Sequence, residues 1–184
     1  MTGTHVGVAF MRGDPRCFNE RLIMDTTGGP FVHTEFFLQR GSDIRFYTAA
    51  NLARGERVGG FMPSCRLKTY PDPARWEIVR FPITQACYQS TYAFILQLLA
   101  LRLPYNERDL WQCSIKILLP FERDLDCDHP TTWQKHGVFC SQVCLLLLRR
   151  LALRGSLPGL LPAVTKCNSR GCSPNNLHRL LAGK

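Results

Sequence analysis

The stretch from residue 31 to residue 51 constrains the fold most, because it has the pattern of two strands joined by a tight turn. Aromatic and β-branched residues dominate both runs, FVHTEFFLQRG and DIRFYTAAN, and RGSD between them has the composition of a hairpin turn. Since side chains of a strand alternate between its faces, His33 and Glu35 share one face with Phe37. This face is therefore polar at one end only, and the simplest interpretation is an edge strand.

Three segments in the second half of the chain have helical patterns. From Thr84 to Leu103 apolar residues recur at helical spacing until Pro104 stops the pattern. The segment 138–153 is apolar nearly all round until its arginines, so we expect a buried helix. A last short helix is expected to begin at Ser173, a good N-cap that is followed by proline.

Strands followed by helices, without an internal repeat, predict an α+β fold in a single domain spanning residues 1–184. We expect an antiparallel sheet packed against the helices near 85–103 and 138–153. The strands expected in addition to the hairpin follow the same pattern. The full set of expected strands lies near residues 5–11, 31–39, 44–49, 66–70 and 76–81.

Composition limits the class of protein. With 45% hydrophobic and 20% charged residues the chain is globular, its beginning lacks the pattern of a secretory signal, and its apolar runs are too short to span a bilayer. Nine cysteines, an odd number, do not suggest a disulfide framework, so we expect a reducing, cytoplasmic compartment. The net charge of +9 indicates a solvated basic surface or attraction to an anionic surface or partner.

Cys140 lies where the buried helix is expected to begin, after the glycine-containing loop KHGVF. Unpaired N–H groups and the positive end of the helix dipole stabilise a thiolate, and the same N–H groups can hold an oxyanion. A histidine would complete such a catalytic site by pairing with the thiolate and protonating the leaving group. His33 is the candidate for this role.

Three motifs, GPFVHTEFFL, LPYN and FCSQVCLLLL, occur in an order that resembles the circularly permuted branch of the NlpC-like papain fold. In that branch the histidine strand precedes the cysteine helix, and the terminal SPNNL is similar to a segment that often closes these domains. The resemblance spans residues 5 to 181. It implies a thiol hydrolase or acyltransferase that cleaves amide, ester or thioester bonds, or transfers acyl groups, through a thioester acyl-enzyme, on peptide-like or lipid substrates and without a metal or organic cofactor.

Within this resemblance Cys140 is the nucleophile and His33 the base. Glu35 matches the His–x–Glu pattern and is the first candidate for the third catalytic residue. Thr48 is the alternative, because a turn centred on Gly41 and Ser42 places it opposite Glu35. The remaining candidates are side chains near the oxyanion, namely Tyr105 of LPYN and, more weakly, Gln134.

Two other functions compete with the enzyme. A zinc site is suggested by Cys127, Asp128, His129, His136 and Cys140, with Cys167 and Cys172 as further ligands, although their spacings are irregular. A papain-like module that binds without turnover is the other alternative, since a fold alone does not establish activity.

Overall fold

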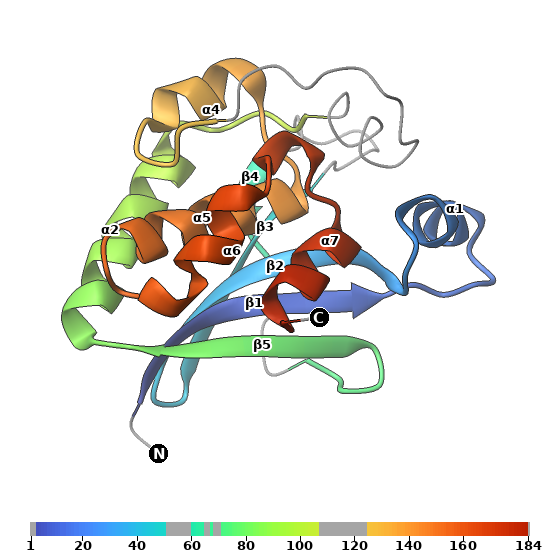
Figure 1. The fold of residues 1–184 in the computed structure, drawn as a ribbon, viewed down its shortest axis with the longest axis horizontal. Helices are drawn as coiled ribbons and strands as arrows, with labels where there is room; N and C mark the ends of the chain where they lie inside the picture. Colours follow the sequence, from blue (N-terminus) through green and yellow to red (C-terminus); the bar gives the residue numbers. More distant parts are fainter. Residues whose placement is uncertain (1–2, 51–59, 65–66, 68–70, 107–124, 184) are drawn as a thin grey trace.

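The computed structural model describes residues 3–50, 60–64, 67, 71–106 and 125–183. Its centre is a five-stranded antiparallel sheet in the order β4-β3-β2-β1-β5 (Figure 1). Four of the expected strands are confirmed, whereas the one near 66–70 lies outside the described residues apart from Leu67. The strands are β1 Thr4–Arg12, β2 Phe31–Arg40, β3 Asp43–Ala50, β4 Gly60–Pro63 and β5 Trp76–Ile83.

The hairpin of β2 and β3 has the expected register. Arg40 pairs with Asp43 and Phe36 with Tyr47, which centres the turn on Gly41 and Ser42. Gly41 has a φ of 60°, a conformation that glycine adopts without strain. The expectation of an edge strand was wrong, because β2 lies between β1 and β3.

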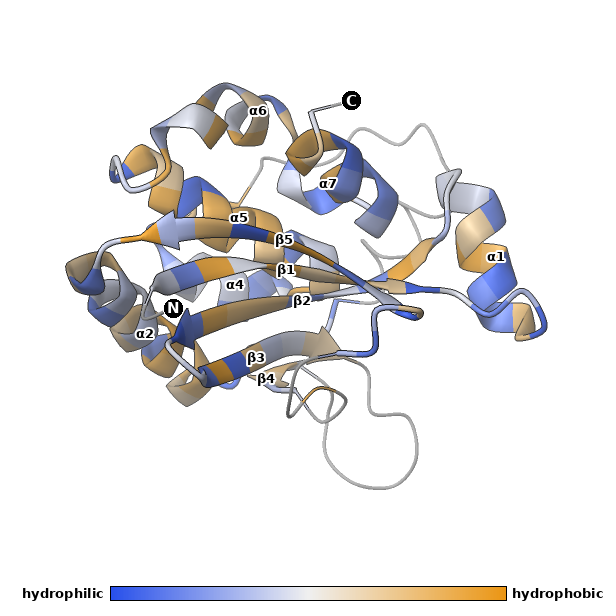
Figure 2. Ribbon diagram, turned by 90° about the horizontal axis from the view of Figure 1, so that it is seen from below, coloured by the Kyte–Doolittle hydropathy of each residue, from blue (hydrophilic) through white to orange (hydrophobic). Residues whose placement is uncertain are grey.

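The helices are α1 Phe18–Thr27, α2 Gln85–Ala100, α4 Pro130–His136, α5 Cys140–Leu153, α6 Leu161–Lys166 and α7 Pro174–Leu181, with short 3-10 turns at Pro158–Leu160 and Ser169–Gly171. In Figures 1 and 2, α2, α5, α6 and α7 lie on one side of the sheet, and α1 lies beyond one end of it. The expected α+β class, with helices packed on an antiparallel sheet, is therefore confirmed. In the part of the chain that the structure describes, no helix is both long and apolar enough to cross a bilayer.

Two helix boundaries differ from those expected. The helix expected from Thr84 to Leu103 is α2, which stops at Ala100. Arg102 takes a positive φ of 49° that breaks the helical path before Pro104. The buried helix begins at Cys140 and not at residue 138, since Val138 is used in a bridge to Tyr105. The cap at Ser173 is confirmed, with its hydroxyl accepting a hydrogen bond from the Asn176 N–H at 3.2 Å.

The core lies between the sheet and α5. Nearly every side chain of α5 is buried, including Leu145 and Leu148, as its uniform hydropathy indicated (Figure 2). A smaller apolar cluster covers the opposite face of the sheet around Phe37 and Phe46, and side chains of α1 pack against it. The sequence did not indicate α1, because the helix has ten residues and its apolar residues Leu22, Ile23 and Met24 are consecutive, which gives little helical periodicity.

Candidate active site

Cys140 is the first residue of α5 and is 3% exposed. The preceding residue Phe139 is extended, and its N–H donates to the Gln142 side-chain oxygen at 3.3 Å. Gly137 allows the loop before Cys140 to pass close to the backbone of Pro104. Its φ is 74°, and a Cβ there would lie 2.9 Å from the carbonyl oxygen of Pro104. A larger residue would therefore displace the loop that leads into the cysteine.

The LPYN segment lies beside this loop. The Val138 N–H donates to the Pro104 carbonyl at 2.9 Å, and the Asn106 N–H donates to the Val138 carbonyl at 3.1 Å. Tyr105 thus forms a parallel bridge with Val138, two positions before Cys140, although 33 positions separate Tyr105 from Val138 in sequence. Gln134 is placed differently, because its amide donates to the Leu101 carbonyl at the end of α2. Tyr105 is linked through its backbone to the segment that leads into Cys140, whereas the Gln134 side chain is bonded to the end of α2.

His33 lies on β2 and is 8% exposed. Its Nε2 is 2.9 Å from the Thr48 hydroxyl oxygen and 3.6 Å from Oε1 of Glu35. The ring of Trp76 stands edge-on to the imidazole, with 6.5 Å between ring centroids. The structure therefore brings His33, Glu35 and Thr48 together, as the hairpin register indicated.

Glu35 is fully buried, and neither carboxylate oxygen has a hydrogen-bond partner among the described residues. A buried carboxylate without hydrogen bonds is costly unless a positive charge is close by. Oε1 of Glu35 lies 3.6 Å from Nε2 of His33, an imidazole that carries a charge only when protonated. The Thr48 hydroxyl, 2.9 Å from the same nitrogen, fixes the orientation of the ring.

Cys140 and Cys144 show what His33 contributes, because both thiols are buried on the same helix, one turn apart. Burial raises the pKa of Cys144, whose thiol donates to the Thr34 hydroxyl at 3.6 Å. Burial also raises the pKa of Cys140, but the charge and hydrogen bond of His33, followed by hydrogen bonds from Thr34, outweigh it and lower the pKa overall. The opposite directions identify the histidine as the deciding influence.

The β2–β3 ladder ends before this site. Among the described residues its last pair is Phe36 with Tyr47, although β2 starts at Phe31 and β3 continues to Ala50. Beyond Tyr47, β3 pairs with β4. The Thr34 backbone, one residue from His33, can therefore bond Cys140 instead of β3.

Asn175 holds the start of the histidine strand. Its side-chain oxygen accepts from the Phe31 N–H at 3.0 Å, and its amide donates to the Phe31 carbonyl at 2.9 Å and to the Thr27 hydroxyl at 2.6 Å. A Cβ at Gly29 would lie 2.4 Å from the same oxygen, so the glycine leaves room for the clamp. Within SPNNL, the sequence did not indicate this role for Asn175.

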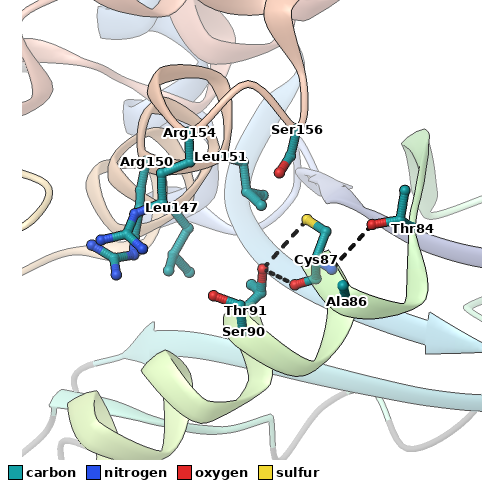
Figure 3. A pocket seen from close by; sticks show the side chains of 10 residues that line it. All are labelled: Thr84, Ala86, Cys87, Ser90, Thr91, Leu147, Arg150, Leu151, Arg154 and Ser156. Atoms are coloured by element: carbon teal, nitrogen blue, oxygen red, sulfur yellow. Dashed lines mark hydrogen bonds between the residues drawn. The ribbon is translucent and has the colours of Figure 1, made fainter.

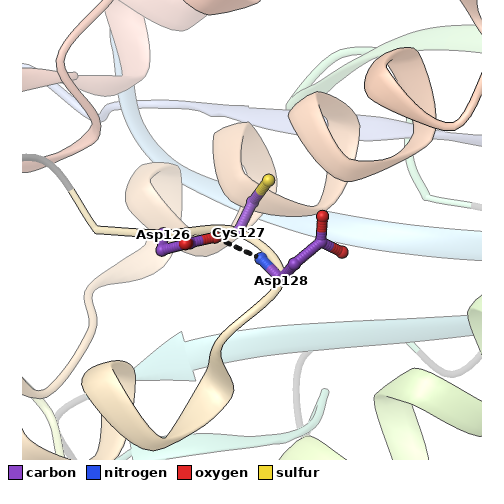
Figure 4. Close-up of side chains that lie close together, drawn as sticks. All are labelled: Asp126, Cys127 and Asp128. Atoms are coloured by element: carbon purple, nitrogen blue, oxygen red, sulfur yellow. Dashed lines mark hydrogen bonds between the residues drawn. The ribbon is translucent and has the colours of Figure 1, made fainter.

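The expected zinc ligands are not gathered. In the described ranges one group of potential ligands lies close together, Asp126, Cys127 and Asp128, with ligand atoms within 4.8 Å of one another (Figure 4). Asp128 is already paired with Arg150 and Arg154. The group offers three ligand atoms where structural zinc takes four, so these three residues do not by themselves form a structural zinc site.

A scan against family models, a search of curated proteins and a search of solved structures each found no match to this chain.

Proposed function

We propose that this chain is a cysteine-dependent hydrolase or acyltransferase with a circularly permuted, NlpC-like papain fold. The observation that carries the proposal is the position of the buried Cys140 thiol, on the first residue of α5 and in hydrogen-bonding contact with His33. The direction of the pKa supports it, because His33 lowers the pKa of Cys140 whereas burial raises the pKa of Cys144 one turn later. A purely structural cysteine in an apolar core has no need of such a partner. A perturbed nucleophile with its base is the pattern of an active site.

In the first half of the reaction the Cys140 thiolate attacks a carbonyl carbon and forms the C–S bond. The carbonyl electron pair moves onto oxygen, and the N–H groups of the first turn of α5 stabilise this oxyanion. As the tetrahedral intermediate collapses, the bond to the leaving amine, alcohol or thiol breaks. The His33 imidazolium donates its proton to that group, and a thioester on Cys140 remains.

In the second half the neutral His33 accepts a proton from the incoming nucleophile as it attacks the thioester. Water gives hydrolysis and a free acid, whereas an amine or alcohol gives acyl transfer. Either route returns the thiolate and the imidazolium, so protons balance over the cycle. Peptide-like and lipid acyl groups both fit this chemistry.

The two neighbours of His33 divide the third role between them. Because Thr48 holds Nε2 at 2.9 Å, Nδ1 is the nitrogen assigned to Cys140 and the leaving group. Glu35, at 3.6 Å from Nε2, stabilises the imidazolium by its charge. Tyr105 remains the candidate side chain at the oxyanion, on the basis of its bridge beside Val138.

The test of the proposal is a search for an acyl adduct on Cys140. Purified protein is incubated with cell extract as the substrate pool, and the peptide containing Cys140 is examined by mass spectrometry. We expect a thioester on Cys140 that hydroxylamine removes, and none on Cys144 of the same peptide. The matched control is His33→Ala, which should not acquire the adduct. Equal adducts in both proteins would exclude the catalytic pair and favour a module that binds without turnover.

A further inference from the structure

A cavity of about 450 Å³ lies between the beginning of α2 and the end of α5 (Figure 3). Arg150, on its wall, is ten residues beyond Cys140 along α5, which corresponds to about 15 Å of helix. The cavity is therefore separate from the candidate active site. Its volume is in the range of small-molecule sites.

Two guanidinium groups, those of Arg150 and Arg154, lie at one end of the cavity, and neither Asp126 nor Asp128 lines it. Arg150 and Arg154 lie one helical turn apart, and both pair with one oxygen of Asp128, the second at 3.1 Å. Two guanidinium groups thus share one carboxylate. Burial, and then repulsion from Arg154, lower the pKa of Arg150, so a further anion at this end would be stabilised. The ring of Phe94 lies 3.8 Å from the Arg150 guanidinium and limits its movement.

The rest of the lining is partly apolar and partly hydroxyl. Leu147, Leu151 and Ala86 supply the apolar surface. The hydroxyls of Ser90 and Ser156 have no hydrogen-bond partner in the described part of the chain, so both can bind a ligand. Figure 3 shows Ser156 facing Cys87 across the cavity, while the Arg150 guanidinium lies away from that thiol.

We propose that this cavity binds a small anionic amphiphile, with its acid group at Arg150 and Arg154 and its aliphatic body against Leu147 and Leu151. A neutral ligand would leave the guanidinium pair unused, and a polyanion such as a nucleic acid would leave the apolar wall unused. The acid group is a carboxylate or a phosphate monoester, since both match the planar fork of arginine. This inference does not depend on the proposed activity.

Cys87 provides the readout, because its thiol lines the cavity and is partly exposed. Cys87 is labelled with iodoacetamide in the presence of octanoate, octyl phosphate or octanol. The extent of labelling is measured by mass spectrometry and normalised to that of the exposed Cys17. We expect octanoate or octyl phosphate to slow labelling of Cys87 and octanol at equal concentration to leave it unchanged. The more protective anion identifies the acid group. Protection by octanol equal to that by the anions, or no protection by any of the three, would overturn the proposal.

The variant that tests the charge is Arg154→Gln, whose side chain is half exposed and whose loss should leave the fold intact. Loss of one charged hydrogen bond should weaken apparent binding of the protective anion by about tenfold or more. The matched control is Arg179→Gln, which makes the same charge change on an exposed side chain of α7 that does not line the cavity. If the anion protects Cys87 of Arg154→Gln as well as it protects Cys87 of wild type and of Arg179→Gln, the arginine end does not bind the ligand.

Discussion

The pH dependence of Cys140 alkylation is the most direct measure of the proposed catalytic pair. In wild type, burial alone would raise the pKa of Cys140, and His33 more than reverses this effect. His33→Ala leaves burial as the largest remaining influence, so the thiol should resemble Cys144, whose pKa is raised. The pKa of Cys140 should therefore change from below to above the ordinary value of a thiol.

The size of the effect follows from the ionised fraction. A thiol with an ordinary pKa of about 8.5 is roughly 3% thiolate at pH 7, and the variant should lie below this fraction. Because wild type lies above roughly 3% and the variant below it, we expect the labelling rate at pH 7 to fall in proportion to the two ionised fractions. As the pH is lowered, labelling of Cys140 in wild type should slow only when the pH passes the depressed pKa of the thiol. In His33→Ala the labelling of Cys140 should already slow at a higher pH.

The assay is iodoacetamide labelling from pH 5 to pH 10, with Cys140 and Cys144 resolved by fragmentation mass spectrometry. Since Cys140 is 3% exposed, the absolute rate also reflects access, and the pH of half-maximal labelling is the quantity to compare. Cys144 serves as the internal control and should stay unlabelled near neutral pH in both proteins. Superimposable pH profiles for wild type and His33→Ala would refute the assignment of His33.

Three further outcomes are expected. Glu35→Gln should lower turnover by roughly tenfold, because the imidazolium loses its nearby charge. Unchanged turnover together with a damaging Thr48→Val would assign the third role to Thr48 alone. Asn175→Leu should lower the free energy of unfolding by about 1–3 kcal/mol, since the Phe31 N–H and carbonyl lose their partner; a change below 0.5 kcal/mol would argue against the clamp. Leu146→Ala, in the fully buried part of α5, should cost about 2–5 kcal/mol in urea unfolding, and a neutral result would contradict the packing of α5 in the core.

The sequence by itself determined the features that depend on local rules. Alternation and turn composition located the hairpin, and the turn at Gly41 and Ser42 set a register that brings the Thr48 hydroxyl to 2.9 Å from Nε2 of His33. The all-round apolar pattern of the segment from 138 onward indicated that α5 is buried. The glycine before Cys140 and the histidine strand suggested the pair, since helix termini have predictable electrostatics.

Only the tertiary structure decided which distant segments meet. The interior position of β2 depends on the order of strands in the sheet, which alternation does not encode. The Asn175 clamp joins residues 144 positions apart, and no periodicity in the chain reveals such a pairing. The charges at the cavity between α2 and α5 likewise depend on tertiary structure, because Asp128 pairs with Arg150 and Arg154 from a distant segment. Periodicity and turn composition act between near neighbours in sequence, whereas the pKa of Cys140 is set by groups that packing alone brings close.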